Sequence, residues 1–400
     1  MNTSPSRFLI LLTVISLDLL TGMEFDLFVP AFPQMQNHFQ LTPFWVEALL
    51  SANFLGYCSS LFFIGVFSDR YGRKPVILFG LIIFIIGSFL CLSPHFYSLL
   101  LIGRFLQGIG IAAPSILSFL IIADIYPLKD QQFLMGVLNG TMNLAVAISP
   151  VMGSYITLYF NWQGNFSALA ILGIATLMMT IIFIPHQKMQ SSDSALSLHG
   201  YLAILKSKPL MLLITYIIFI IVPYWVFVGM SPLLYIKELN VSLEHFGYYQ
   251  GALAFVFAIG SILFGFMLKH ADIPQKRMLI LSTYMLLIST IIFVAVTILD
   301  VRNPLIITLA FLPFIISQII PSVILYPLAL NILPQAKAKI SALIQGGKYV
   351  LTAIGLQIAG YFYHASFQNI GIVVSVFIVG ALVLQYFVVH NEEINPEIKQ

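Results

Sequence analysis

Three acidic residues lie inside the first long apolar run of the chain, residues 8–32. They are Asp18, Glu24 and Asp26. A charge at the centre of a membrane-spanning helix costs about 2.5–3.5 kcal/mol, so each of the three is a functional candidate. On a helix, Asp18 and Asp26 would be about 12 Å apart along the axis and about 80° apart around it, so both can face one cavity. Glu24 points about 120° away from Asp18, toward another helix or the outer interface.

Carboxyl groups at this depth are suited to proton exchange. A carboxylate that is removed from water favours its protonated form, so Asp18 and Asp26 could load and release protons as access alternates between the two sides of a membrane. Competition between a proton and a substrate for one carboxylate would couple their fluxes. Two alternatives remain open: the groups could be permanently paired, or they could lie in water near the outer mouth.

Two basic residues also lie within apolar runs. Arg104, in residues 97–123, cannot lose its proton and needs acidic or carbonyl partners. The first-run carboxylates are candidates, and a purely structural contact with carbonyl groups is the alternative. Lys348, in residues 340–363, could attract an anionic substrate or pair with a carboxylate of the other half. It could also extend toward the inner surface.

A charged hairpin separates the apolar runs 44–67 and 76–92. Its residues, 65–75, read Gly-Val-Phe-Ser-Asp-Arg-Tyr-Gly-Arg-Lys-Pro. Basic clusters in short loops stay on the cytoplasmic side of a membrane, so this hairpin predicts the orientation of the chain. Gly72 can take the positive φ of a sharp turn, and Gly65 can allow a close backbone approach near a helix end.

The composition excludes an ordinary soluble domain. Hydrophobic residues make up 60% of the 400 residues and charged residues 8%, whereas soluble domains carry about 25% charged residues. Cys58 and Cys91 both lie in apolar runs, so no disulfide framework or metal site is expected. The first run lacks a cleavage signature and is expected to be retained. No nucleotide-binding loop, nucleophile triad or metal-ligand cluster is found, so the sequence predicts neither an enzyme nor a cofactor.

The apolar runs predict an all-α integral membrane protein with twelve spanning helices in two bundles of six. The expected spans are residues 8–32, 44–67, 76–92, 97–123, 133–159, 166–184, 210–235, 246–268, 278–299, 305–333, 340–363 and 370–389. The expected organisation is a first bundle at 1–184, a cytoplasmic linker at 185–208, a second bundle at 209–390 and a cytoplasmic tail at 391–400. Fourteen of the 18 Lys and Arg residues fall on the predicted inner side and two, Lys237 and Arg302, on the outer side. That asymmetry predicts that both termini are cytoplasmic.

The hairpin pattern G-x-x-x-D-R-x-G-R-K resembles the loop between the second and third helices of major facilitator superfamily transporters. The segment R-x-x-Q-G-x-G, which begins at Arg104, is similar to the fourth-helix motif of that family. Asp124 matches the position that joins Asp69 and Arg73 in a charge relay, and the resemblance implies that this relay locks the outward-open state. The gating residues so implied are Gly65, Asp69, Arg70, Gly72, Arg73, Lys74 and Asp124.

The first helix resembles one branch of that superfamily. Residues 26–33, Asp-Leu-Phe-Val-Pro-Ala-Phe-Pro, are similar to the D-x-Y-L-P-A-x-P pattern of the Bcr/CflA drug-resistance branch, with Phe28 in place of tyrosine. The spacing of Asp18 and Asp26 is similar to that of an acidic pair in multidrug–proton antiporters. The antiporter motif G-x-x-x-G-P-x-x-G is matched only in part, because Ala145 and Ser149 stand at two of its glycine positions.

The sequence therefore predicts a proton-coupled antiporter that exports small amphipathic or drug-like molecules across a bacterial inner membrane. The alternative is a carrier of a metabolite, organic anion or siderophore, which Arg104 and Lys348 favour. The expected proton-coupling residues are Asp18, Asp26 and Arg104, and the expected substrate-binding residues are Glu24, Gln107, Tyr224, Trp225 and Lys348. The expected partners are a small-molecule substrate, protons and the lipid bilayer, with no nucleic acid and a monomeric chain.

Overall fold

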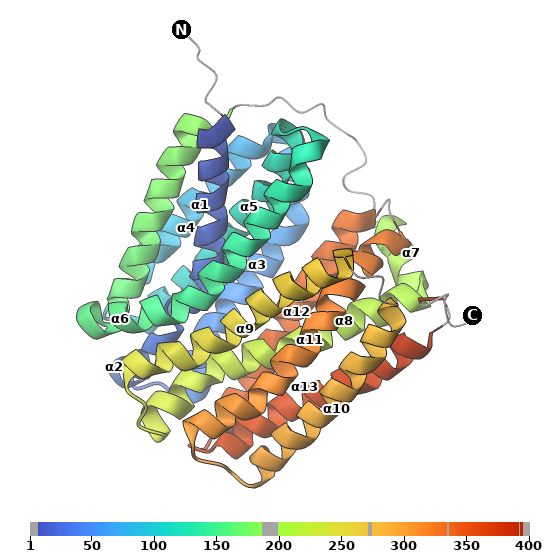
Figure 1. The fold of residues 1–400 in the computed structure, drawn as a ribbon. Coiled ribbons are helices and arrows are strands. Elements are labelled where there is room, and N and C mark those ends of the chain that lie inside the picture. The colour runs from blue at the N-terminus through green and yellow to red at the C-terminus, as the bar shows by residue number, and fades with distance from the viewer. Residues whose placement is uncertain (1–6, 186–198, 271–273, 334–335, 392, 395–400) are drawn as a thin grey trace. The chain divides into compact units, whose positions relative to one another are not determined.

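A computed structural model describes residues 7–185, 199–270, 274–333, 336–391 and 393–394. These residues form helices and connecting turns, without a strand (Figure 1). The serines of the predicted linker, Ser191, Ser192, Ser194 and Ser197, lie outside the described residues, as do Lys188 and Lys399. The chain divides into two compact units, Met1–Leu196 with Leu243–Gly251, and Ser197–Ser242 with Ala252–Gln400.

The first unit is built from six α-helices and one short 3-10 helix. They are α1 (Arg7–Asp26), η1 (Val29–Ala31), α2 (Phe32–Phe39), α3 (Pro43–Tyr71), α4 (Arg73–Leu90), α5 (Tyr97–Ile125) and α6 (Leu128–Phe183). Within this unit α5 packs against both α3 and α4, and α1 packs against α6. The helix α5, which carries Arg104, is therefore central to the packing.

The second unit is also helical. It contains α7 (His199–Lys206), α8 (Lys208–Pro232), the π-helix η2 (Leu233–Glu238), most of α9 (Leu243–His270), α10 (Gln275–Ile298), α11 (Pro304–Ile332), α12 (Lys337–Phe362) and α13 (Phe367–His390). Here α8 packs against α12 and α13, and α10 packs against α11 and α13. The described end of the predicted linker, residues 199–206, forms α7.

Nine helices within the described residues are long and apolar enough to cross a membrane, or ten if the bent α3 counts as one span. The predicted fifth and sixth spans are joined in α6, which breaks at Asn161 (φ 58°, ψ −173°). Its apolar part, Leu134–Phe183, has 50 residues, and since one span needs about 20, the parts before and after the break are each long enough to cross a bilayer. The nine or ten spans of the described residues are fewer than the predicted twelve, because the predicted fifth and sixth spans form one element and α12 is not among the spans found.

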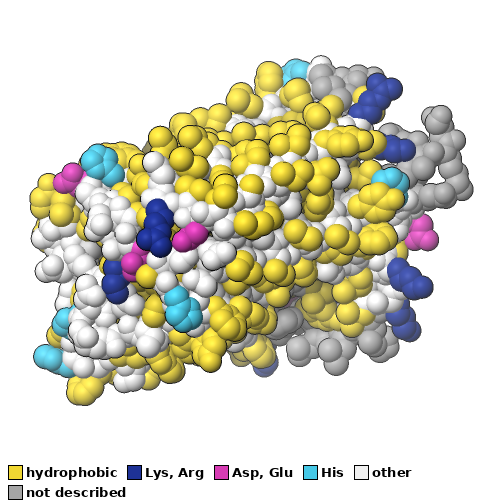
Figure 2. Space-filling view, turned by 90° about the horizontal axis from the view of Figure 1, so that it is seen from below, with side chains coloured by type: hydrophobic (Ala, Val, Ile, Leu, Met, Phe, Trp, Pro, Cys, Tyr) yellow, Lys and Arg dark blue, Asp and Glu magenta, His cyan; other side chains and the backbone are white. Residues whose placement is uncertain are grey.

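Much of the surface is apolar, as a lipid-facing protein requires. Exposed side chains include Phe79, Tyr159, Ile171, Ile262 and Tyr361, each at least 60% exposed. In Figure 2 hydrophobic side chains spread over the middle of the visible face, while the charged side chains lie toward its left and right ends. In water such patches would drive aggregation, whereas in a bilayer they contact acyl chains.

Glycines let α5 approach its two neighbours closely. A Cβ at Gly108 would lie 2.0 Å from the carbonyl oxygen of Asn53 in α3, and one at Gly110 would lie 2.5 Å from the carbonyl oxygen of Gly80 in α4. Small residues at helix interfaces permit this contact in membranes. The two glycines of the R-x-x-Q-G-x-G segment therefore serve opposite faces of α5.

Within the first unit, no close approach is found at Gly65. Apart from the backbone of its own helical turn, no heavy atom of this unit's described residues lies within 4 Å of the position that a Cβ would take there. By contrast, Gly72 has φ 90° and separates α3 from α4, as expected for a sharp turn. The requirement for glycine in this hairpin thus comes from backbone conformation at residue 72.

These two environments predict opposite effects of the same substitution on stability. Gly108→Ala should lower the free energy of unfolding by about 1–3 kcal/mol, because its methyl group overlaps the backbone of α3. Gly65→Ala should leave that free energy unchanged or raise it by up to about 1 kcal/mol, since alanine is the better helix former. Thermal unfolding of both variants in detergent measures the difference, and equal stabilities would contradict the close-packing argument.

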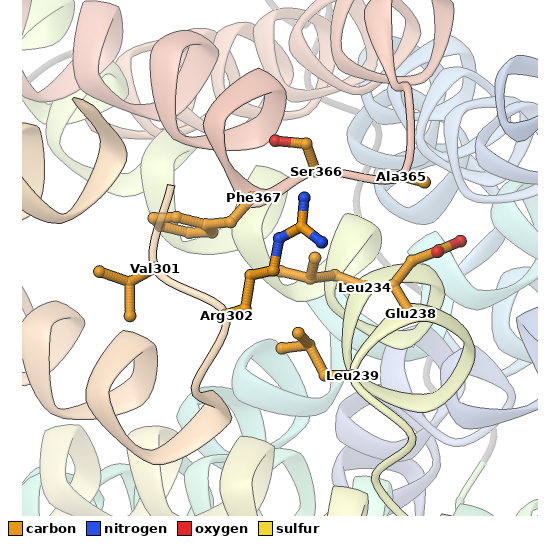
Figure 3. A pocket seen from close by; sticks show the side chains of 8 residues that line it. All are labelled: Leu234, Glu238, Leu239, Val301, Arg302, Ala365, Ser366 and Phe367. Carbon is orange, nitrogen blue, oxygen red and sulfur yellow. The ribbon is translucent and has the colours of Figure 1, made fainter. Parts of the chain in front are cut away.

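At one end of the second unit, a carboxylate joins the α10–α11 turn to the α12–α13 turn. Oδ1 of Asp300 accepts hydrogen bonds from Oγ of Ser366 (2.7 Å) and from the backbone N–H of Gln368 (3.2 Å). Both turns contain a residue of positive φ, Asp300 at 44° and Ala365 at 56°. Arg302 and Ser366 from these turns, together with Glu238 of η2, line a small pocket (Figure 3).

This contact predicts a loss of stability at acidic pH. The hydrogen bond from Ser366 holds the pKa of Asp300 below its usual range, aided by Gln368 and Arg302. The contribution is therefore full above the unfolded-state pKa of about 3.9 and is lost as pH falls through the lower folded-state value. Asp300→Ala should cost about 1 kcal/mol at neutral pH. Unfolding measured from about pH 6 to pH 3 should show the two proteins converging; parallel curves would contradict this.

Candidate functional site

The helix α1 carries the three acidic residues and ends at the last of them, Asp26. The sequence predicts a helix through residue 32, but Pro30 and Pro33 lack backbone N–H donors, and the chain turns into η1 instead. All three carboxyl side chains are buried: Asp18 and Glu24 are 0% exposed and Asp26 is 1% exposed. Asp26 is therefore the last residue of the helix, and the two residues that follow it form a turn.

Arg104 of α5 binds Glu24, and not Asp18 or Asp26. Its Nη1 lies 2.7 Å from Oε1 of Glu24, and both side chains are fully buried. The side-chain nitrogen of Asn53 donates to the same oxygen (2.7 Å) and to the carbonyl oxygen of Arg104 (3.1 Å). The sequence correctly directs Glu24 away from Asp18 toward another helix, but it leaves open which carboxylate pairs with Arg104.

Gln107 completes this network from one turn further along α5. Its Oε1 accepts from Nη1 of Arg104 (2.6 Å), and its Nε2 donates to Oγ of Ser88 in α4 (2.8 Å). The side chain is 0% exposed. Both the oxygen and the nitrogen of the Gln107 amide thus make hydrogen bonds inside the bundle. This geometry favours a role in positioning Arg104, whereas the sequence predicts that Gln107 contacts the substrate directly.

Several polar atoms around this network lack hydrogen-bond partners among the described residues. They are both carboxyl oxygens of Asp18, both of Asp26, Oε2 of Glu24, and Nε and Nη2 of Arg104. The guanidinium carbon of Arg104 lies 3.9 Å from the ring centroid of Phe28, which covers its face. Buried polar atoms without partners are costly, so this layer of the bundle is well suited to rearrangement.

The charged hairpin forms a second cluster at the other end of α3. Arg73 donates from Nη1 to Asp69 (2.7 Å) and to Oγ of Ser68 (2.7 Å), and from Nε to Asp124 of α5 (3.1 Å). The Arg73 side chain is 9% exposed, while Asp69 and Asp124 are 40% and 24% exposed. The structure thus brings together the three residues that the resemblance places in one relay.

The other basic residues of the hairpin lie outside this cluster. Arg70 packs over the ring of Tyr71, with 5.4 Å between the guanidinium carbon and the ring centroid. The ammonium group of Lys74 donates to the carbonyl oxygen of Ile181 in α6 (2.7 Å). Lys74 therefore fixes the end of α6 beside the start of α4.

In the second unit, two of the predicted substrate-binding residues, Trp225 and Lys348, contact Tyr349, and a third, Tyr224, lies beside Trp225. The ring of Trp225 lies 5.7 Å from that of Tyr224 and 6.4 Å from that of Tyr349. The ammonium nitrogen of Lys348 lies 4.1 Å from the centroid of the Tyr349 ring. These side chains come from α8 and α12, and they form one aromatic cluster that carries a cation.

Glu47, Asn53 and Ser88 are buried polar residues of this region that the sequence motifs did not indicate. Glu47 is 0% exposed and neither of its carboxyl oxygens has a hydrogen-bond partner among the described residues. Its signal was present, because it is the single acidic residue in the apolar run 44–67. Asn53 and Ser88 had no such signal, since uncharged polar residues are common in spanning helices.

The apolar helices of spanning length identify a multi-pass membrane protein, and the buried acid–base network and the charged hairpin lie in its first unit. The chain belongs to the Major Facilitator Superfamily, whose family model matches residues 15–356. This match confirms the family and the fold that the sequence motifs predict, and it places the chain among transporters and not enzymes.

Two curated relatives carry drug-resistance names. The bicyclomycin resistance protein homolog of Haemophilus influenzae is 25% identical over 253 residues, which cover 62% of this chain and 64% of that protein. The multidrug resistance protein MdtL of Escherichia coli O9:H4 is 32% identical over 179 residues, 45% of each chain. The matched region thus spans less than two thirds of either relative.

Solved transporters share the fold. A D-xylose–proton symporter superposes with a TM-score of 0.74 at 15% identity, over 95% of this chain and 97% of that chain. A bacterial homolog of the human lysosomal transporter Spinster superposes with a TM-score of 0.79 at 16% identity, over 97% of both chains. At this level of identity the similarity establishes architecture alone.

Proposed function

We propose that this protein is a proton-coupled antiporter that exports small amphipathic or drug-like molecules across the bacterial inner membrane. The observation that carries the proposal is the pair Asp18 and Asp26, two buried carboxyl groups on α1 that make no hydrogen bond within the described residues. The drug-resistance names of the two relatives support the substrate class. On this proposal the chain acts as a monomer with both termini cytoplasmic and has no nucleic-acid partner.

The proposed mechanism assigns proton exchange to Asp26 and Asp18. A buried carboxyl group without a partner is accommodated at lowest cost when it carries a proton, and hydration on one side of the membrane allows that proton to leave. Substrate and proton compete for the same carboxyl groups, so the gradient drives export. Arg104 stays charged throughout and, held by Glu24 and Gln107, fixes the helix that faces α1.

The hairpin cluster is the proposed gate. Arg73 joins Asp69 at the end of α3 to Asp124 at the end of α5, and this link must break if those two helix ends separate. Its two carboxylates are partly exposed, so water can replace their contacts with Arg73 and each contact can break and re-form during a transport cycle. The rings of Tyr224, Trp225 and Tyr349 are the proposed substrate contact of the second unit, and Lys348 is a substrate contact only for the alternative, an organic anion.

Transport by the purified protein in liposomes with an imposed pH gradient tests the proposal. A panel of cationic, neutral and anionic drug-like probes should show uptake that depends on the gradient for the cationic and neutral compounds. Lys348→Met should leave that uptake intact, whereas it should abolish transport if the substrate is an organic anion. Uptake that persists unchanged after the gradient is collapsed would exclude proton coupling.

A further inference from the structure

Glu47, in α3, is a buried carboxyl group that the proposed mechanism does not use. It lies five residues into Pro43–Tyr71 and is 0% exposed. Neither carboxyl oxygen has a hydrogen-bond partner among the described residues, and none of the ion pairs formed there includes it. A glutamate kept only for packing would be unusual, because glutamine or leucine would fill the same space without a charge to desolvate.

The neighbouring contacts locate Glu47 within the first unit. Two residues before it, the carbonyl oxygen of Trp45 accepts a hydrogen bond from Oη of Tyr97 (2.6 Å), which joins the starts of α3 and α5. Six residues after it, about 9 Å along the helix, Asn53 binds Glu24. Glu47 therefore lies between the network around Arg104 and the end of the bundle opposite the hairpin cluster.

No cation on the elements packed around α3 neutralises Glu47 within the described residues. Arg104 is bound to Glu24, and Arg73 and Lys74 lie at the opposite end of α3. His38 of α2 is exposed and its ring nitrogen contacts the carbonyl oxygen of Pro94. The titratable groups of neighbouring elements at this end of the first unit are His38 of α2, Cys91 and His95 of the turn after α4, and Tyr97 of α5, with Glu24 and Arg104 in the network further along.

We propose that Glu47 is a further proton-binding site of this transporter, separate from Asp18 and Asp26. Its carboxylate binds one proton from water when its end of α3 is hydrated, holds that proton while it is buried, and releases it to water when that end opens again. The step transfers a proton alone, and no other bond forms or breaks. The inference rests on the proposed proton-coupled function, in which the ends of the bundle open and close.

Infrared difference spectroscopy of the full-length protein in lipid tests the site with protons as the only ligand. Spectra recorded at about pH 6 and pH 9 show the carbonyl stretch of each carboxylic acid that loses its proton in that interval. One carbonyl band, assigned to Glu47, should be absent from the spectrum of Glu47→Gln and present in that of Asp26→Asn. The spectrum of Asp26→Asn should instead lack a different band. Glu244→Gln is the matched control, because Glu244 is exposed in the first turn of α9, and its spectrum should equal that of the unchanged protein.

The outcomes separate this site from the proposed function. A Glu47→Gln spectrum identical to that of the unchanged protein would overturn the inference, whatever the transport assay shows. If the protein shows no gradient-driven transport but its spectrum contains the Glu47 component, the antiporter proposal is overturned and Glu47 is still a proton-binding site. Glu47→Asp keeps a carboxyl group and should move the component without removing it, so it provides the assignment if Glu47→Gln does not fold.

Discussion

Arg104→Met is expected to lower the free energy of unfolding by about 3–5 kcal/mol, because it leaves Glu24 buried without its positive partner. The two side chains are 0% exposed and 2.7 Å apart, so water cannot replace the lost contact. Glu24→Gln should have a similar effect by leaving the guanidinium group unpaired. Unfolding of both single variants and of the double variant in mixed micelles gives the coupling energy of the pair.

The double variant should be more stable than the sum of the two single losses predicts, since it removes both buried charges. Arg302→Met is the matched control: its ion pair with Asp300 is 3.6 Å long and the arginine is 77% exposed. That substitution should change the free energy of unfolding by no more than about 0.5–1 kcal/mol. Equal losses for Arg104→Met and Arg302→Met would show that burial does not determine the strength of the pair.

Sequence patterns predicted most reliably the contacts between residues that are close together in the sequence. The hairpin is short, so Asp69 and Arg73 are four residues apart and their contact follows almost directly from their spacing. The turn at Gly72 likewise follows from the local sequence. Spanning segments are equally local, because length and apolarity are properties of one continuous run.

The partner of Arg104 could not be predicted, because it depends on packing between helices. Spacing along α1 gives the direction of Glu24 relative to Asp18 but does not say which helix lies in that direction. Asn53 of α3 and Ser88 of α4 join the network only because glycines bring α5 close to both helices. Glu47 was missed for a different reason: it lies outside the first span and outside every motif, so its charge within an apolar run was its only signal.

Asp26→Asn is expected to abolish accumulation of substrate against its gradient while it leaves exchange down a gradient measurable. Asparagine keeps the size of the side chain but cannot exchange a proton, so the pH gradient no longer drives export. A fall of at least about tenfold in the accumulation ratio corresponds to about 1.4 kcal/mol of lost driving force. Counterflow and gradient-driven uptake in the same liposomes measure the two activities separately.

Asp300→Asn is the matched control, because Asp300 lies in a turn between spans and has no part in the proposed proton path. It should accumulate substrate as the unchanged protein does.

Asp18→Asn tests the second carboxyl group. A partial loss of accumulation in Asp18→Asn, beside a complete loss in Asp26→Asn, would show that Asp26 contributes more to proton coupling than Asp18. If Asp26→Asn accumulates substrate normally, Asp26 is not the coupling group. Asp18 would then be the remaining proton carrier on α1, because Glu24 is bound to Arg104 and Asp18 has no hydrogen-bond partner among the described residues.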